Sequence, residues 1–266
     1  MTPSPFDHIR IILVEPRGSA NVGSTARAMK NFGLSDLCLV KPFAKIDGQA
    51  RGMASKAQDV LCRATRHASL ESAIGDCRYV VGFTASEEKG CLTRLDFDAA
   101  MQMVFQDAAH SRIGFLFGRE DWGLDHMALD RCRYVTQIPT SPLYASLNLA
   151  QAVLVVGYSL FRLAHQAPAI KGPEQISEDW LEAPVQDREG LYDDITQTLA
   201  HIGYINPETS ISMLRYMRRM VERMRLATKE VRILRGICRQ MRWAKDSGRL
   251  AAGPMASPAD SQESQY

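Results

Sequence analysis

The sequence predicts an α/β fold with a mostly parallel sheet, followed by a small helical C-terminal extension. Apolar segments rich in branched residues alternate with helix-like segments along the first 165 residues. These segments are almost continuously apolar, as expected for strands that are covered on both faces. We expect strands at 9–15, 36–42, 79–85, 113–118 and 134–140.

Helix-like segments separate and follow these strands. We expect helices at 21–33, ending at Gly33, and at 69–77, 96–107 and 147–165. The last of these is apolar on more than one face, so it should be deeply buried or packed on a partner. We therefore expect a symmetric homodimer that uses this helix and residues near 21–30.

The C-terminal part combines an acidic and a basic block. Residues 174–194 hold eight acidic side chains against one basic, whereas 213–249 hold twelve basic against three acidic, although the net charge is only +2. The prolines and acids of 168–187 predict a linker, and 188–246 should be helical. The arginines of 213–249 recur at helical spacing and predict RNA binding. The alternative is a solvated surface whose buried face carries Met213, Met217, Met220, Met224 and Leu234.

The expected organisation is thus a domain at 1–167, a linker at 168–187, a helical RNA-binding extension at 188–246 and a disordered tail at 247–266. Composition is ordinary for a globular protein, with 45% hydrophobic and 23% charged residues. No apolar run is long enough for a membrane span, and no secretory signal is evident, so we expect a cytoplasmic protein. The six cysteines form no CxxC pair and the histidines show no ligand spacing, so we expect no metal site.

The first segment whose residues could form a binding or catalytic site is 15–33, where a strand meets a helix. It nearly fits a phosphate-binding loop, but Ser24 stands where the required lysine would be, which argues against a nucleotide triphosphatase. What remains is a polar helix N-terminus with Asn21 and, further along, Arg27, which could face a phosphate. The alternative is that Asn21 is an ordinary cap and Arg27 a surface charge.

Two later segments also place polar and small residues at strand ends. After 113–118 come Gly118 and Glu120, and after 134–140 come Ser146 and Asn148. Ligands of parallel sheets bind at the carboxyl ends of strands, and glycine there permits close approach of a ligand. The alternatives are a plain turn at Gly118 and an ordinary helix cap at Ser146.

Taken together, the three segments resemble the SpoU class of RNA ribose 2′-O-methyltransferases, within the SPOUT superfamily. That class carries an N…GS.AR motif, an FG.E..GL motif and an IP…SLN.A motif in this order. They stand here as Asn21–Arg27, Phe117–Leu124 and Ile138–Ala150. The strand at 79–85 and the segment ending TKEVRILRGICRQM further resemble TrmJ-type tRNA enzymes.

The resemblance implies a deep trefoil knot at the C-terminal side of the α/β domain, a rare exception to unknotted chains. It also implies a bound S-adenosylmethionine, the homodimer, and no need for a metal. By residue-wise carry-over, the cofactor pocket would use Phe83, Thr84, Ala85, Gly118, Ile138, Ala145, Ser146 and Leu147.

The resemblance further implies 2′-O-methylation of tRNA at nucleotide 32 of the anticodon loop. In the class, the counterpart of Arg27 is assigned as the base, but a guanidinium almost never loses its proton. We instead expect Arg27 to orient the 2′-hydroxyl and stabilise the developing alkoxide. Asn21, Glu120, Ser146 and Asn148 would position Arg27 and the substrate. Two alternatives stay open: an rRNA target, and a catalytically silent RNA-binding protein.

Overall fold

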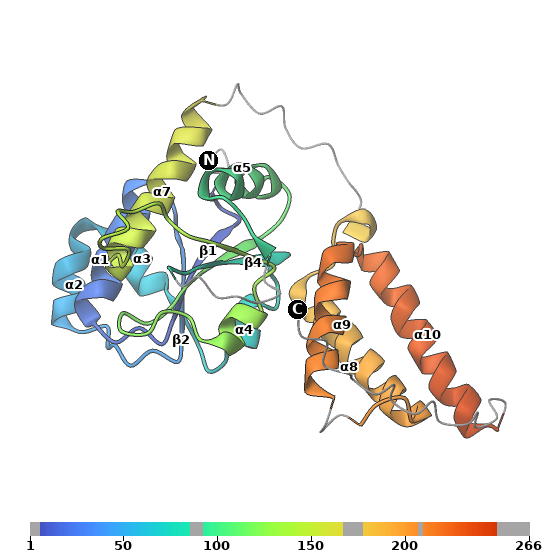
Figure 1. The fold of residues 1–266 in the computed structure, drawn as a ribbon. Coiled ribbons are helices and arrows are strands. Elements are labelled where there is room, and N and C mark those ends of the chain that lie inside the picture. Colours follow the sequence, from blue (N-terminus) through green and yellow to red (C-terminus); the bar gives the residue numbers. More distant parts are fainter. Residues whose placement is uncertain (1–5, 86–92, 167–177, 207–209, 249–266) are drawn as a thin grey trace. The chain divides into compact units, whose positions relative to one another are not determined.

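The computed structural model describes residues 6–85, 93–166, 178–206 and 210–248 (Figure 1). The chain forms two compact units. Unit 1 comprises 1–176 together with 184–186, and unit 2 comprises 177–183 together with 187–266. Among the described helices, none combines the length and apolar character that crossing a bilayer requires.

Unit 1 is built on a sheet whose described strands all pair in parallel. Their order is β3-β2-β1-β6-β4-β7-β5. The strands are β1 (Ile9–Val14), β2 (Asp36–Val40), β3 (Thr65–His67), β4 (Tyr79–Phe83), β5 (Thr93–Arg94), β6 (Ile113–Phe117) and β7 (Tyr134–Thr136). The predicted α/β class is confirmed, and the trefoil knot stays a prediction.

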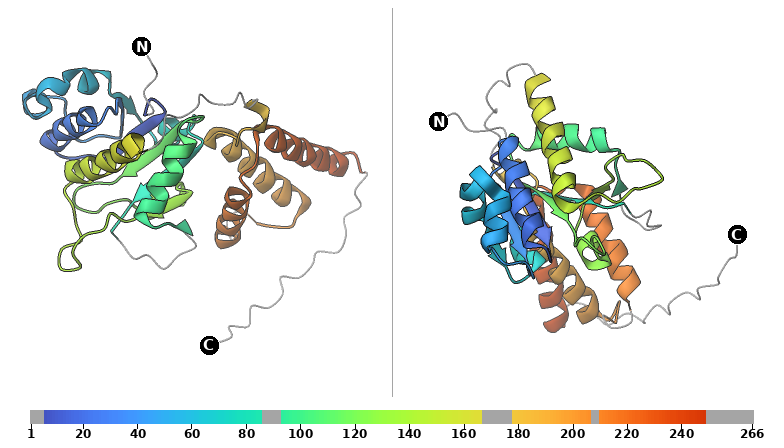
Figure 2. Two further views of the ribbon diagram at one scale, coloured as in Figure 1. Left: turned by 90° about the horizontal axis from the view of Figure 1, so that it is seen from above. Right: turned by 90° about the vertical axis from the view of Figure 1, so that its left-hand side faces the viewer.

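Helices cover both faces of this sheet (Figures 1 and 2). Alternate residues of β1 point to opposite sides, since Ile11 and Leu13 join one apolar core and Ile12 joins another. The larger core includes residues of α1 (Ser19–Asn31), α2 (Gly48–Ala54), α3 (Gln58–Arg63), α5 (Phe97–Asp107) and α7 (Leu149–Gln166). The smaller includes residues of α4 (Leu70–Ile74) and α6 (His126–Asp130).

The predicted strands and long helices of unit 1 are present, with boundaries that shift by a few residues. The first helix begins at Ser19, two residues earlier than expected, and ends at Asn31, with Gly33 at a φ of +76°. The last begins at Leu149 rather than 147. Sequence patterns missed short elements, which are α2, the 3₁₀ turn η1 (Ser55–Ala57), α3, β3, β5 and α6.

Unit 2 is helical and contains the turn η2 (Glu178–Trp180), α8 (Val185–Ile202) from Asp187 onwards, α9 (Ile211–Met224) and α10 (Thr228–Asp246). Its small core consists of apolar residues such as Leu191, Val221 and Val231. Residues 178–187, which we expected to belong to the linker at 168–187, are instead part of the folded structure. There, Ala183 is fully buried, and its amide donates to Leu226 O at 2.8 Å. Residues 167–177 and most of the expected tail (249–266) lie outside the described residues.

The acidic and basic blocks of the sequence meet within unit 2. Asp194 Oδ2 accepts from Arg235 at 2.7 Å, and Asp194 Oδ1 from Arg242 at 2.9 Å. The other ion pairs between the two blocks are Arg188–Glu222, Arg218–Glu189, Arg225–Glu182 and Arg232–Asp179, and Arg188 also pairs with Glu182 within the acidic block. Many of the arginines expected to grip phosphates are therefore held by carboxylates. The alternative buried face is also wrong in part, because Met220 and Met224 are exposed by 52% and 58%.

Candidate active site

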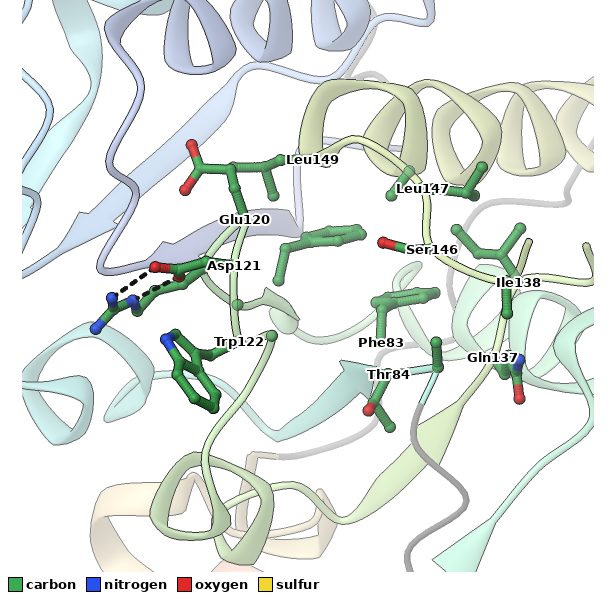
Figure 3. A pocket seen from close by; sticks show the side chains of 17 residues that line it. Phe83, Thr84, Glu120, Asp121, Trp122, Gln137, Ile138, Ser146, Leu147 and Leu149 are labelled. Carbon is green, nitrogen blue, oxygen red and sulfur yellow. Dashed lines mark hydrogen bonds and ion pairs between the residues drawn. The ribbon is translucent and has the colours of Figure 1, made fainter.

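A cavity of about 260 Å³ opens at the carboxyl ends of β4, β6 and β7, where the sequence predicted a ligand (Figure 3). All eight residues predicted for the cofactor line it, which are Phe83, Thr84, Ala85, Gly118, Ile138, Ala145, Ser146 and Leu147. The side chains of Glu120, Asp121, Trp122 and Gln137 also line it, as do Leu149 and Ala152 of α7. The second and third motif segments, far apart in sequence, therefore share one cavity with the end of β4, whereas no residue of the first motif segment lines it.

Stacked aromatic rings form an apolar wall of this cavity. Phe83 at the end of β4 stacks on Phe117 at the end of β6, with ring centroids 4.6 Å apart and an interplanar angle of 4°. Phe115 meets Phe83 edge-on at 5.2 Å. Phe83 and Phe117 line the cavity and are themselves almost fully buried, so the wall is held rigidly by core packing.

Gly118 is required by the turn that follows β6. Arg119 and Gly123 exchange two backbone hydrogen bonds of 3.0 and 2.8 Å, and Gly123 has a φ of +72°. A Cβ on Gly118 would lie 2.0 Å from the carbonyl carbon of Gly123, which is impossible without opening the turn. The close approach that excludes a side chain is therefore made by the protein's own backbone, rather than by a ligand as the sequence suggested.

Glu120 is the centre of a hydrogen-bond network beside the cavity. Its Oε1 accepts from Asn21 Nδ2 at 2.8 Å and from the Gly18 amide at 3.0 Å. Its Oε2 accepts from the Arg17 amide at 3.0 Å. Asn21 Oδ1 in turn accepts from Asn148 Nδ2 at 3.0 Å. One polar residue from each motif segment is thus joined in a chain of direct bonds.

The same contacts keep Glu120 ionised. Burial by itself raises the pKa of this carboxyl group. The hydrogen bonds from Asn21 and from the amides of Arg17 and Gly18 outweigh burial, so the net pKa is lowered from its ordinary value. A protonated Glu120 would lose acceptor capacity at this point, and the network therefore depends on the anion.

The alternatives for Asn21 and Ser146 as ordinary caps do not hold. Gly18 occupies the N-cap position of α1, and Asn21 lies inside the helix. At the start of α7, the capping contact comes from Asn148, whose Oδ1 accepts from the Ala150 amide at 2.9 Å. Asn148 therefore caps the helix with its Oδ1 atom and binds Asn21 with its Nδ2 atom.

Arg27 stands apart from this arrangement. It is exposed on α1 and is absent from the residues that line the cavity. Within the described part of the chain, no hydrogen bond or ion pair of its side chain is found. The structure thus brings together Asn21, Glu120, Ser146 and Asn148, and leaves Arg27 as an exposed cation outside the cavity of its own subunit.

A set of charged residues at the rim was missed from the sequence. Asp121 Oδ2 accepts from Arg17 and from Arg119, each at 2.9 Å, and Arg119 also lies 3.5 Å from Glu15. The hydrogen bonds from Arg119, the largest influence, and from Arg17 hold the pKa of Asp121 far below its usual range. Arg17 adjoins the first motif, and Glu120 and Asp121 lie in the second. The contacts between them form only where the ends of two strands meet, so the sequence alone does not reveal them. The residues that the structure describes contain no cluster suited to a metal ion.

Comparison with known proteins identifies the family. The model of the SpoU rRNA Methylase family matches residues 8–158, and that of the C-terminal domain of tRNA methyltransferase TrmJ matches 186–252. The tRNA (cytidine/uridine-2′-O-)-methyltransferase TrmJ of Pectobacterium atrosepticum is 39% identical over 87% of this chain and 95% of its own length. The protein of the same name from Photorhabdus laumondii is 36% identical over 90% and 99%.

Solved structures agree with the sequence relatives. TrmJ from Z. mobilis ZM4 superposes with a TM-score of 0.75 at 29% identity, over 87% of this chain and 98% of that one. A probable methylase family protein from Haemophilus influenzae gives a TM-score of 0.58 at 30% identity, over 91% and 99%. The first family model covers more than half of the chain, and the TrmJ relatives match nearly all of it. The chain therefore belongs to the SpoU rRNA Methylase family, as its motifs predicted, and is a methyltransferase of the TrmJ type.

Proposed function

We propose that the chain transfers a methyl group from S-adenosylmethionine to the 2′-hydroxyl of a tRNA ribose, at nucleotide 32 of the anticodon loop. The observation that carries the proposal is the cavity lined by the second and third motif segments, to which Asn21 of the first is joined by its hydrogen bonds to Glu120 and Asn148. The names of the TrmJ relatives, which specify tRNA and a cytidine or uridine 2′-oxygen, support the substrate.

The cavity suits S-adenosylmethionine in shape and charge. The stacked pair of Phe83 and Phe117 offers an apolar surface for adenine, and the strand-end turns offer backbone groups to polar atoms. Glu120 and Asp121 place negative charge at the rim, which complements a sulfonium cation. When bound, the cofactor supplies an activated methyl group, so the reaction needs no metal.

The residues of the chain then have to orient a poor nucleophile. In the transfer, the bond from the methyl carbon to the ribose 2′-oxygen would form as its bond to the cofactor sulfur breaks, which releases the demethylated cofactor, and the hydroxyl proton would pass to solvent water. Arg27 cannot accept this proton at neutral pH, because guanidinium keeps its charge. We assign to Arg27 the orientation of the 2′-hydroxyl and its adjacent phosphate, and the stabilisation of the developing alkoxide. Ser146 at the cavity wall and Asn148 would hold the ribose.

In a homodimer, Arg27 of one subunit would lie near the cavity of the other. Leu154 and Tyr158 are exposed by 39% and 51% on α7, four residues apart and so on one face. The same helix packs along α1, which carries Arg27. An apolar face of this kind suits a two-fold interface, and a two-fold pairing of α1 and α7 surfaces would bring the partner subunit's Arg27 towards the cavity.

The test is transfer of labelled methyl groups into unmodified tRNA. We expect incorporation into a tRNA transcript, and no incorporation when nucleotide 32 alone carries deoxyribose, because the attacking oxygen is then absent. A matched transcript with deoxyribose at nucleotide 35 should be methylated normally. If the transcript with deoxyribose at nucleotide 32 is still methylated, nucleotide 32 is not the target, and mapping the methyl group would identify the nucleotide that is.

The same assay separates the two alternative functions. Incorporation into ribosomal RNA but not tRNA would indicate an rRNA enzyme of this family. Binding of tRNA and of S-adenosylmethionine without transfer to any RNA would indicate a catalytically silent RNA-binding protein. The basic extension of residues 188–246 is expected to contribute to tRNA binding, through the arginines that carboxylates do not hold.

A further inference from the structure

An exposed aromatic side chain stands beside the active site. The segment Lys41–Lys45, with the sequence KPFAK, directly follows β2 at the carboxyl edge of the sheet. Phe43 at its centre is exposed by 62%. A single exposed apolar residue is ordinary in itself, but the surroundings of Phe43 give it the features of a binding platform.

The backbone under Phe43 is fixed to the Glu120 network. The amides of Phe43 and Ala44 both donate to Pro16 O, at 3.1 and 2.9 Å. The next residue, Arg17, donates its amide to Glu120. Lys41 and Glu15, at neighbouring strand ends, have φ values of +43° and +52°. Non-glycine residues are strained in this conformation, and such strain concentrates at functional sites.

One face of the Phe43 ring is backed by cations, and the other is open. The guanidinium carbons of Arg17 and Arg119 lie 5.7 and 5.8 Å from the ring centroid. Both groups also bond the same oxygen of Asp121, each at 2.9 Å. Two groups on opposite faces would be separated by nearly the sum of the ring distances, farther than a shared oxygen permits. They therefore occupy one side of the ring, and the 62% exposure of Phe43 is consistent with an uncovered second face.

Two lysines flank Phe43 in the sequence. Lys41 and Lys45 are exposed, and the described residues provide neither side chain with an ion pair or a hydrogen bond. Arg17 and Arg119, in contrast, are engaged by Asp121 and Glu15. Within the described residues of this segment and its two neighbouring arginines, the cations without a partner are thus Lys41 and Lys45. An aromatic face between open cations is the arrangement by which proteins hold single-stranded RNA, through base stacking and phosphate contacts.

We propose that residues 41–45 form a nucleotide subsite, in which an RNA base next to the methylated nucleotide stacks on Phe43 and Lys41 and Lys45 contact its phosphates. The inference rests on the proposed function, because it concerns the RNA that enters the same site. The subsite sets the register of the RNA strand on the enzyme, so that one particular ribose reaches the cavity. Phe43 is therefore a positioning and specificity residue, without a role in the chemical step.

Phe43→Leu and Phe43→Trp test the stacking in the full chain. Leucine keeps an apolar side chain but removes the π-face, and tryptophan keeps the π-face. We expect Phe43→Leu to raise the Kd and KM for tRNA about tenfold, within the range of base–aromatic stacking, and Phe43→Trp to restore both. Affinity for S-adenosylmethionine should be unchanged in both variants, because Phe43 does not line the cavity.

A fluorescent base locates the stacking independently of activity. With 2-aminopurine placed on either side of the methylated nucleotide, the wild type and Phe43→Trp should quench one of the two positions on binding, and Phe43→Leu should quench neither. Lys45→Gln should lower the slope of log affinity against log salt by about 0.7, because one phosphate of the single strand is then no longer neutralised. Lys56→Gln, at an exposed lysine of the η1 turn, is the matched control and should leave it unchanged.

The outcomes separate the two claims. If the wild type methylates tRNA and Phe43→Leu binds and quenches like the wild type, the subsite is wrong and the proposed function stands. If the wild type neither binds nor methylates RNA, both are wrong. Failure of both Phe43 variants to bind S-adenosylmethionine would also overturn the inference, because Phe43 would then be a structural support of the cavity.

Discussion

Asn21 and Glu120 are 99 residues apart in sequence, yet Asn21 Nδ2 donates to Glu120 Oε1 at 2.8 Å. The other end of the Asn21 amide accepts from Asn148, so this single side chain joins the end of β6 to the start of α7. An amide has both a donor and an acceptor end, whereas a carboxylate only accepts. Asparagine therefore satisfies both neighbours, and an aspartate at this position could satisfy only Asn148.

Glu120→Gln should disrupt this arrangement and reduce methyl transfer about a hundredfold, since small displacements of positioning groups have effects of that order. The glutamine would present an NH₂ group to the amides of Arg17 and Gly18 or to Asn21, so that donor would face donor. Transfer to tRNA at saturating substrate measures the effect. Asp125→Asn, at the cap of α6 on the same loop, is the matched control and should retain most of the activity.

The lowered pKa of Glu120 makes a prediction about acid stability. A group with a folded-state pKa below its unfolded value adds stability above the unfolded value, about 4.3 for glutamate, and loses it as the pH falls through the folded value. The difference in stability between wild type and Glu120→Gln should be constant from pH 8 to pH 5 and then shrink. Thermal unfolding across this range checks it. A difference that grew on acidification would contradict the ionised network.

Arg188 should be the most sensitive charged residue of unit 2. It is 1% exposed, and it makes two bonds to Glu222, at 2.9 and 3.2 Å, and a further one to Ala183 O. Arg188→Met would leave Glu222 and the buried Glu182 without their shared cation, and should destabilise unit 2 by about 3–5 kcal/mol. Arg232→Met removes an exposed pair with Asp179 and should cost less than about 1 kcal/mol.

Tryptophan fluorescence can follow this unit by itself. Trp180 and Trp243 belong to unit 2 and the exposed Trp122 to unit 1, so a Trp122→Phe background reports on unit 2 during urea unfolding. Equal midpoints for the Arg188 and Arg232 variants would mean that the buried ion pairs contribute nothing particular.

Arg27 should act across the dimer interface, and subunit mixing can test this. Arg27→Ala should abolish transfer but keep cofactor affinity, and Gly118→Ala should destroy the cavity through its clash with Gly123. Mixed dimers contain one intact cavity, and it faces an intact arginine only if that arginine comes from the other subunit. Activity should therefore reappear on mixing two inactive variants. Continued inactivity, with mixed dimers verified, would place Arg27 in its own subunit's site.

The sequence predicted the long elements and the cavity better than the short elements and the charge pairing. Helix α7 has a sustained apolar period, whereas α2 and α6 have seven and five residues and depend on tertiary packing. Aspartate at the N-caps of these two helices is a start signal that the sequence contains. Asp47 and Asp125 each accept a hydrogen bond from the amide three residues later. Motif spacing located Glu120 and Asn148, but the contacts of Asp121 with Arg17 arise only where strands β1 and β6 end side by side.

The charge blocks of the C-terminal part show the same limit. Read along the chain, an acidic stretch and a basic stretch suggest a linker and an RNA-binding surface. In space, Arg235 lies 2.7 Å from Asp194, 41 residues away. Helical spacing shows which residues share a face of one helix, but not which face of another helix opposes them.

The salt dependence of tRNA binding should therefore come from few residues of unit 2. Arg223 and Arg239 are exposed, and in the described ranges neither has an ion pair or hydrogen bond, whereas Arg235 and Arg242 share Asp194. Each arginine that meets a phosphate releases counterions, so the double variant Arg223→Gln/Arg239→Gln should lower the slope of log affinity against log salt by about 1.4 to 1.8. Arg235→Gln, which leaves Arg242 on Asp194, should change the slope little.

These point variants test unit 2 more cleanly than its removal. Deletion from residue 170 onwards would also take away Val185, which is buried in the core of unit 1 and donates its amide to Cys77 O at 2.8 Å. Weak binding by such a truncation could then reflect damage to the sheet. The full-length variants keep this hydrogen bond, and their affinity for S-adenosylmethionine provides the check that the cavity is intact. If the double variant keeps the wild-type salt slope, phosphates are gripped elsewhere, and RNA binding belongs to unit 1 alone.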